Sequence, residues 1–173
     1  EVAGRERFLL EICDEIRART GSDFPILVKI NCSDFEEDDG VWDACQSACI
    51  NLAEKGISAI EISGGLDGSP FPPDSIPYDE SVFRDFAAEI ADRVSVPVIL
   101  VGLNRTPSVM STLLNTTGIE YFSLSRPLLR QPDLPNFWRA SPAEPAKCIS
   151  CDSCINQPDG NVCPFRKEMV GQA

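Results

Sequence analysis

Apolar residues follow two alternating patterns between Arg5 and Leu124. From Arg5 to Thr20 they recur every three to four residues and Gly21 follows, which predicts a helix ending at that glycine. The run Ile26–Asn31 is short and apolar at successive positions, as in a strand buried on both faces of a parallel sheet. The alternation then repeats three times. The further predicted helices are Val41–Lys55, Ser81–Arg93 and Thr106–Leu114, and the further strands are Ala59–Ser63, Pro97–Val101 and Ile119–Leu124.

This regular alternation predicts an α/β fold with a parallel sheet and right-handed crossovers. The pattern fits an open doubly wound sheet or consecutive units of a (β/α)8 barrel, and periodicity does not choose between them. After the fourth strand the rhythm ends in a proline-rich stretch and a cysteine-rich tail, for which we expect a loop-rich structure. We therefore divide the chain into an α/β part, residues 1–140, and a tail, residues 141–173.

Charge and composition exclude several classes of function. The net charge is −12, and Lys and Arg are scattered, which argues against binding to nucleic acid. No apolar stretch reaches the ~20 residues needed to cross a bilayer, and no secretory signal is visible, so we expect a cytoplasmic protein. The sequence contains no histidine, which excludes histidine-based catalysis and metal ligation by histidine from this chain.

Two strand ends have the residue types of an anion site. Gly102, Leu103 and Asn104 lie between the third strand and the next helix, and Ser125 and Arg126 follow the fourth strand. Glycine backbone, a guanidinium and the start of a helix can all bind phosphate. In (β/α)8 enzymes the last two strand-to-helix loops commonly form a phosphate site. The alternative is a pair of ordinary turns with an arginine that faces solvent.

Lys29 and Gly64 are two further candidates for ligand contacts. Lys29 lies inside a strand predicted to be buried, where a cation needs a partner or a ligand. Its alternative role is that of a lysine reaching to solvent from a strand end. Gly64 opens a glycine-rich loop that would let the backbone approach a ligand, which alone is weak evidence. The acidic run Asp34–Asp39 lacks the spacing of a calcium loop and is interpreted as a solvated loop.

The eight cysteines divide into two groups of four. Four lie in apolar or periodic segments and are predicted to be buried: Cys13, Cys32, Cys45 and Cys49. The other four are crowded near the C-terminus: Cys148, Cys151, Cys154 and Cys163. Two overlapping C-x2-C pairs followed by a fourth thiol can close around a zinc ion or a [4Fe–4S] cluster. Free reduced thiols in a tail that packs on the α/β part are the alternative.

The order of the strand and tail motifs resembles a known family. The segments FPILVKIN, AIEISGG, VPVILVG, YFSLSRPLLRQPDLPNFW and CISCDSC resemble the C-terminal half of bacterial NADH:flavin oxidoreductases of the Old Yellow Enzyme family. The resemblance implies the second half of an FMN-binding TIM barrel, with the four strands as its fifth to eighth. The cysteine tail resembles that of 2,4-dienoyl-CoA reductase-like members, which hold a [4Fe–4S] cluster but have longer gaps before the third and fourth cysteines.

The resemblance also implies roles for individual residues. Lys29 takes the position of a basic residue that contacts the flavin ring, and Gly102 with its neighbours contacts the FMN phosphate. Ser125 and Arg126 match the family's Gly-Arg phosphate pair. This chain departs from the family in having Leu103 where a second glycine is common and Ser125 in place of a glycine. Of these assignments, Arg126 departs least.

The activity implied is hydride transfer from NAD(P)H through FMN to an activated alkene of a small unsaturated carbonyl compound. Family members serve the substrate with a histidine pair or a His/Asn pair, which this chain lacks, so we expect no catalytic residue here and no activity of the chain alone. The open sheet edges of a half barrel predict a homo-oligomer. Two other functions stay open: a four-cysteine metal-binding interaction module, and a phosphate-binding barrel enzyme that uses no flavin.

Overall fold

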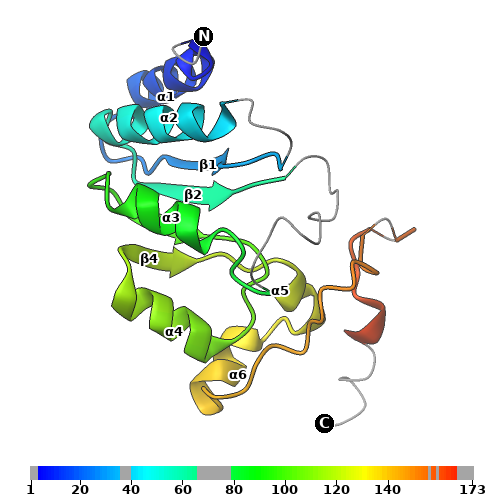
Figure 1. Ribbon diagram of the computed structural model, residues 1–173. Coiled ribbons are helices and arrows are strands. Elements are labelled where there is room, and N and C mark those ends of the chain that lie inside the picture. Colours follow the sequence, from blue (N-terminus) through cyan, green and yellow to red (C-terminus); the bar gives the residue numbers. More distant parts are fainter. Residues whose placement is uncertain (1–3, 36–39, 66–78, 156, 159, 167–173) are drawn as a thin grey trace.

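The computed structural model describes residues 4–35, 40–65, 79–155, 157–158 and 160–166. Most of the glycine-rich loop after Gly64 and of the acidic run lies outside these ranges. Helices α1 (Arg7–Thr20), α2 (Val41–Glu54), α3 (Arg84–Ala91) and α4 (Pro107–Thr116) alternate with strands β1 (Leu27–Asn31), β2 (Ala59–Ser63), β3 (Val98–Leu100) and β4 (Ile119–Phe122) (Figure 1). The strands are parallel and their spatial order is β1-β2-β3-β4. The predicted α/β fold with four parallel strands is confirmed.

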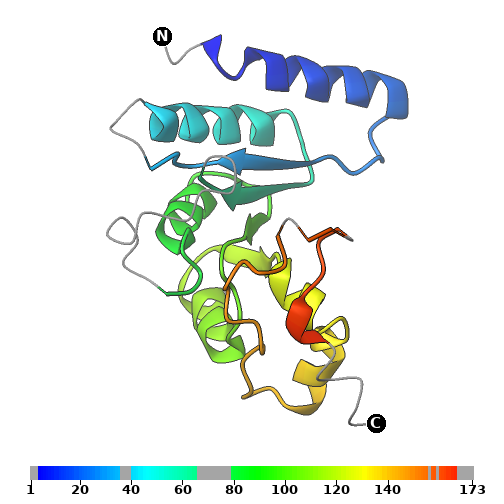
Figure 2. The ribbon, with the colours of Figure 1, turned by 90° about the vertical axis from the view of Figure 1, so that its right-hand side faces the viewer.

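The two faces of the sheet have different surroundings. Helices α2, α3 and α4 lie along one side of the sheet (Figures 1 and 2), and the hydrophobic core fills the space between. A row of four side chains in register crosses the sheet, namely Lys29, Glu61, Ile99 and Tyr121. None of these four belongs to the buried core, and Tyr121 is 56% exposed. The row therefore marks the face that these helices leave uncovered.

Among the element ends that differ from the predicted ones, two lie beside the loops at the carboxyl ends of the strands. Helix α3 begins at Arg84 rather than Ser81, because Ser81 adopts the left-handed region, with φ 51°, and its hydroxyl donates to Asn104. Strand β4 ends at Phe122 rather than Leu124. Ser123 and Leu124 instead line a cavity at the carboxyl ends of the strands. In both places, residues predicted to continue an element form the strand-end loops.

The segment that follows β4 is more helical than the sequence predicted. Helices α5 (Arg126–Arg130) and α6 (Leu134–Ala140) follow β4, and a 3-10 turn, η2 (Pro164–Arg166), lies beside α5 (Figure 2). Both α5 and α6 carry proline in the first turn, where the missing N–H costs no helix hydrogen bond. The Ala146 N–H donates to the Arg105 carbonyl at 2.8 Å, which ties the tail to the α/β part. The division at residue 140 stays a prediction.

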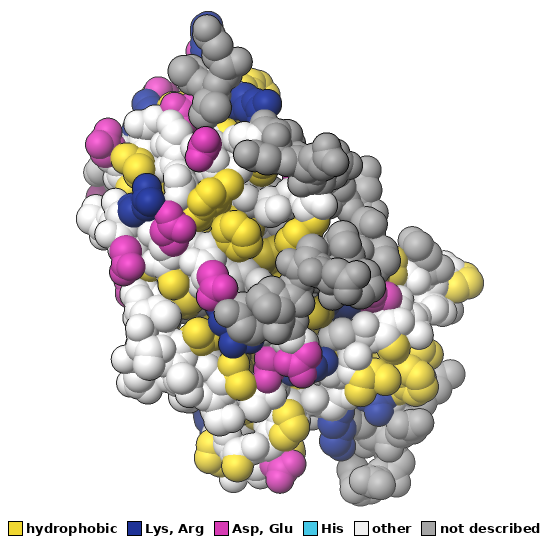
Figure 3. Space-filling model, viewed as in Figure 1, with side chains coloured by type: hydrophobic (Ala, Val, Ile, Leu, Met, Phe, Trp, Pro, Cys, Tyr) yellow, Lys and Arg dark blue, Asp and Glu magenta, His cyan; other side chains and the backbone are white. Residues whose placement is uncertain are grey.

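On the surface visible in Figure 3, small groups of acidic and of basic side chains are scattered among hydrophobic ones. The described residues on this face form no continuous basic stripe. In the described part of the chain, no helix is both long enough and apolar enough to cross a membrane.

Candidate functional site

A cavity of about 90 Å³ lies where the β3–α4 loop, the β4–α5 loop and the tail meet. We call it the strand-end cavity. The residues that line it are Val101, Gly102, Leu103, Asn104, Ser123, Leu124, Ser125, Arg126, Pro127 and Ser150. Five of the seven residues predicted to contact a cofactor are therefore brought together in one place. The remaining two, Lys29 and Gly64, do not line this cavity.

Backbone groups at the strand-end cavity are available to a ligand. Within the described residues, the N–H groups of Leu103, Ser125 and Arg126 have no hydrogen-bond partner. Gly102 and Leu103 both have positive φ, 112° and 56°, so the chain turns sharply as it leaves β3. Unpaired N–H groups carry partial positive charge, and several of them around one cavity suit an anion such as phosphate.

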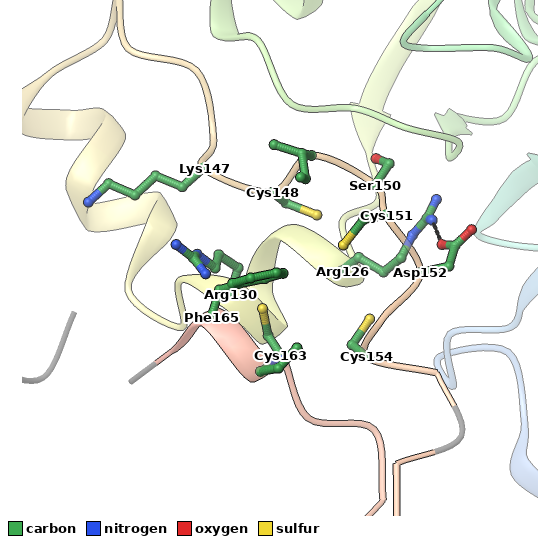
Figure 4. Close-up of a pocket in the computed structure, with 12 residues that line it drawn as sticks. Arg126, Arg130, Lys147, Cys148, Ser150, Cys151, Asp152, Cys154, Cys163 and Phe165 are labelled. Carbon is green, nitrogen blue, oxygen red and sulfur yellow. Dashed lines mark hydrogen bonds and ion pairs between the residues drawn. The ribbon is translucent and has the colours of Figure 1, made fainter. Parts of the chain in front are cut away.

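Arg126 provides the positive charge at the strand-end cavity. It is the first residue of α5, and its guanidinium forms an ion pair with Asp152 of the cysteine tail (Figure 4). Arg105, the other basic residue in these two loops, does not line the cavity. Its guanidinium donates to the Asp79 carbonyl at 3.0 Å and lies 3.5 Å from the Asp79 carboxylate. An anion entering the cavity therefore meets Arg126, which it must share with Asp152.

The start of helix α4 is less suited to an anion than its sequence predicts. The buried Glu80 carboxylate accepts the N–H of the capping residue Thr106 at 3.0 Å. A carboxylate at the N-terminus of a helix already uses the favourable end of the helix dipole. An anion in this region would therefore be bound by the preceding loop and by Arg126 more than by the N-terminus of α4.

Packing accounts for both predicted glycine contacts. A Cβ built on Gly64 would lie 2.7 Å from the Phe83 ring, and one built on Gly102 would also lie 2.7 Å from that ring. Real Cβ atoms do not approach other atoms so closely. The buried Phe83 ring, 2% exposed, therefore requires glycine at the ends of both β2 and β3. A Cβ on Gly64 would also lie 2.8 Å from the Ser33 carbonyl oxygen. Gly102 lines the strand-end cavity, whereas Gly64 does not.

Lys29 is connected to the strand-end cavity through a polar chain across the sheet. Its ammonium lies 2.5 Å from the Glu61 carboxylate, and the Ser123 hydroxyl donates to the other Glu61 oxygen at 2.5 Å. The Lys29 side chain is 56% exposed, so the strand position predicted to need a partner has one and also faces outward. Ser123 lines the cavity. These contacts link the Lys29 ammonium on β1, through Glu61, to Ser123 in the wall of the cavity.

The four tail cysteines line a second cavity of about 150 Å³, which we call the cysteine pocket. Figure 4 shows the sulfur atoms of Cys148, Cys151, Cys154 and Cys163 directed toward a common space. Arg126 lines this pocket as well as the strand-end cavity, while the Lys147 side chain points away from the sulfur atoms. Within the described residues, no group of three or more Cys, Asp or Glu side chains forms a site that could hold a metal ion. The thiols are gathered, but they do not have the geometry of a closed zinc site.

Burial and hydrogen bonding shift the pKa of several thiols in different directions. The four cysteines predicted to be buried are buried. Burial raises the pKa of the Cys32 thiol, and a hydrogen bond with Cys45, followed by burial, raises the pKa of Cys49. In the tail, hydrogen bonds from Ser153 lower the pKa of the exposed Cys151. Burial raises the pKa of its neighbour Cys154.

We expect these differences to appear in alkylation by iodoacetamide. The thiolate is the reactive form, so a lowered pKa lets Cys151 react from a lower pH than an ordinary thiol, whereas Cys32 and Cys49 stay protonated and shielded. Peptide mapping by mass spectrometry after a short pulse at pH 7, on protein treated with a chelator, should find Cys151 modified at least about 10-fold faster than Cys32. The same pulse in urea should make the rates similar. Equal labelling in the folded protein would contradict this assignment.

Several residues of the site were not predicted from the sequence. Glu61 could have been predicted as the partner of Lys29, because it is an acidic residue in the next predicted strand and a lysine in a buried strand needs an opposite charge. Ser150 and Asp152 reach the strand-end cavity and Arg126 from a tail whose position the sequence does not reveal. Ser81 was predicted to begin a helix, and Glu80 directly before it carried no signal of a site role.

Comparison with known proteins bears on this site. No family model matches the sequence. The chain is 27% identical to a metal reductase of Desulforamulus reducens, over 90% of this chain and 24% of that protein. It is also 27% identical to an NADH oxidase of Thermoanaerobacter brockii, over 87% of this chain and 24% of that protein. The chain thus spans about a quarter of the length of these relatives.

Solved structures share the fold. A 2-naphthoyl-CoA reductase matches with a TM-score of 0.71 at 20% identity, covering 87% of this chain and 23% of that one. An Old Yellow Enzyme homologue from Zymomonas mobilis matches with a TM-score of 0.62 at 21% identity, covering 84% of this chain and 39% of that one. Together with the sequence relatives, they confirm that the chain resembles part of an Old Yellow Enzyme-type oxidoreductase.

Proposed function

We propose that the chain forms the FMN-phosphate side of a flavin-dependent oxidoreductase of the Old Yellow Enzyme type. In such an enzyme, hydride would pass from NAD(P)H through FMN to the activated alkene of a small unsaturated carbonyl compound. The observation that carries the proposal is the strand-end cavity, where two loops with unpaired N–H groups converge on Arg126. The oxidases and reductases among the relatives support the reaction class.

The residues of the strand-end cavity fit a phosphate group. Arg126 would donate charge-assisted hydrogen bonds to the phosphate oxygens, and the N–H groups of Leu103 and Ser125 would add backbone donors. The Ser125 hydroxyl and Ser150 offer further polar contacts. FMN, when bound, would supply the hydride-transfer chemistry, and these contacts to its phosphate would position it.

Lys29 would contact the flavin ring as a hydrogen-bond donor more than as a net charge. An ammonium has three donors, and the ion pair with Glu61 leaves others available on the exposed side chain. Because Glu61 neutralises the cation, the pair adds little net positive charge. Lys29 is therefore suited to orient a ring held by its phosphate elsewhere.

Titration with FMN and with riboflavin, which lacks the phosphate, tests this proposal. A charge-assisted phosphate contact contributes about 1.5–3 kcal/mol, so FMN should bind at least about 10-fold more tightly than riboflavin. Equal affinities would mean that the strand-end cavity does not hold the phosphate. The absence of any signal at saturating FMN would favour a phosphate-binding enzyme that uses no flavin.

We further predict that the chain alone, supplied with FMN and NAD(P)H, does not reduce an enone faster than free FMN does. The physical reason is that a polarising and protonating group must meet the substrate, and the sequence has no histidine to serve this purpose. Absorbance of NAD(P)H at saturating flavin measures the rate. Turnover well above the free-flavin background would contradict the prediction.

A metal-binding role for the tail is the second candidate. The observation in its favour is the convergence of four thiols on one pocket beside the cationic Arg126. A zinc ion and a [4Fe–4S] cluster both stay candidates, because the spacing of the four cysteines suits either group. Elemental analysis of anaerobically purified protein separates the possibilities. Iron with labile sulfide would support the cluster, and zinc would support an interaction module. If the protein contains neither metal, the cysteines are plain thiols.

A homo-oligomer and a cytoplasmic location also stay predictions. The uncovered face carries Leu27, 60% exposed, and Tyr121, 56% exposed, and β1 and β4 are the edges of the described sheet. Open edges and exposed apolar side chains favour association with a second copy. Sedimentation should detect a dimer or a larger assembly. A monomer at high concentration would contradict this.

A further inference from the structure

The side chain of Asn104 is buried in the wall of the strand-end cavity, with 2% of its surface exposed. Its amide nitrogen donates to the Leu100 carbonyl at 2.8 Å and to the Ser123 carbonyl at 3.1 Å. Its oxygen accepts the Ser81 hydroxyl at 2.9 Å. Both donors of the amide are therefore used inside the protein, and neither is left for a ligand.

These three hydrogen bonds join the segments that build the cavity. Leu100 ends β3, Ser123 follows β4, and Ser81 belongs to the segment before α3. The Ser123 N–H also donates to the Leu100 carbonyl at 2.9 Å, so the two strand ends are connected at the same point by backbone and by Asn104. Asn104 thereby fixes the separation between the loop of Leu103 and the loop of Arg126.

The segment before α3 supports the same loop at two more places. The Val82 N–H donates to the Gly102 carbonyl at 3.1 Å, and the Glu80 carboxylate accepts the Thr106 N–H at 3.0 Å. Contacts from this segment thus reach the β3–α4 loop before, at and after Asn104. The loop is therefore held by residues that do not themselves line the strand-end cavity.

We propose that Asn104 is a positioning residue for the FMN phosphate: it sets the spacing of the two loops that grip the phosphate without touching the phosphate itself. This inference rests on the proposed function. A buried side chain whose polar groups are all paired holds its neighbours in one arrangement, and an anion site made from two loops depends on that arrangement.

Replacing Asn104 with aspartate tests this role at nearly constant volume. A carboxylate cannot donate to the Leu100 and Ser123 carbonyls and repels both, so the two loops should separate. Asn115→Asp is the matched control. Asn115 lies exposed on α4, its amide donates to the Ser111 carbonyl at 2.7 Å, and the substitution adds the same negative charge. Ser81→Ala is a milder variant that removes a single hydrogen bond and should fold.

The measured quantity is the ratio of FMN to riboflavin affinity in each variant. We expect Asn104→Asp to lower this ratio about 10-fold, Ser81→Ala about 3-fold, and Asn115→Asp to leave it unchanged, with riboflavin affinity similar throughout. A simple loss of folded protein would lower both affinities equally. If the wild type prefers FMN and both inner variants keep its ratio, Asn104 does not position the phosphate. If the wild type shows no preference, the proposed phosphate site itself is wrong.

Discussion

Replacing Arg126 with alanine is expected to lower FMN affinity by about 10- to 100-fold while changing riboflavin affinity little. Among the described residues that line the strand-end cavity, Arg126 is the one with a positive charge. Hydrogen bonds to a charged group contribute about 1.5–3 kcal/mol, and about 1.4 kcal/mol corresponds to a tenfold change in affinity. The phosphate must compete with Asp152 for the guanidinium, which places the expected loss toward the lower end. Flavin fluorescence titration measures both affinities.

Arg105→Ala is the matched control for this experiment. It removes the same charge from the neighbouring loop, but the Arg105 guanidinium is engaged with Asp79 and does not line the cavity. Because the whole chain carries a net charge of −12, losing any cation weakens anion binding slightly, and this control measures that general effect. If Arg105→Ala reduces FMN affinity as much as Arg126→Ala, the contact at Arg126 is not specific.

The positions of Gly102, Ser125 and Arg126 near one another were predictable because the carboxyl ends of parallel strands meet at one edge of a sheet. That argument needs only the order of strands and the residues that follow them. The reason for glycine at Gly64 and Gly102 was not predictable in this way. Glycine can let a ligand approach or make room for a side chain, and here the side chain is that of Phe83, which lies directly before α3.

The partners of Arg126 and Asn104 could not be predicted for a different reason. Asp152 and Ser150 come from the tail, whose path is set by contacts such as Ala146 with Arg105 rather than by periodicity. Ser81 breaks the expected helix because its hydroxyl bonds to Asn104. Such polar pairs carry no repeating pattern, and sequence periodicity detects only the apolar face of an element.

Phe83→Ala is expected to reduce the free energy of unfolding by about 3–5 kcal/mol, which is typical of removing a fully buried aromatic ring. The ring is 2% exposed, stacks with Phe35 at a centroid distance of 6.0 Å, and fills the space that Gly64 and Gly102 leave. Small domains are stable by about 5–15 kcal/mol in total, so the loss is a large fraction. Urea unfolding followed by circular dichroism measures it.

Phe8→Ala provides the comparison, because Phe8 lies on α1 with 75% of its surface exposed. Phe8→Ala should change the free energy of unfolding by no more than about 0.5 kcal/mol, as most surface substitutions do. A similarly small loss of stability in both variants would contradict the assignment of Phe83 as a core residue that the fold depends on. Phe83 also lies beneath both the β2 and the β3 loops, so the proposed phosphate grip and the stability of the fold depend on the same ring. Phe83→Ala should therefore weaken FMN binding even under conditions in which the variant remains folded.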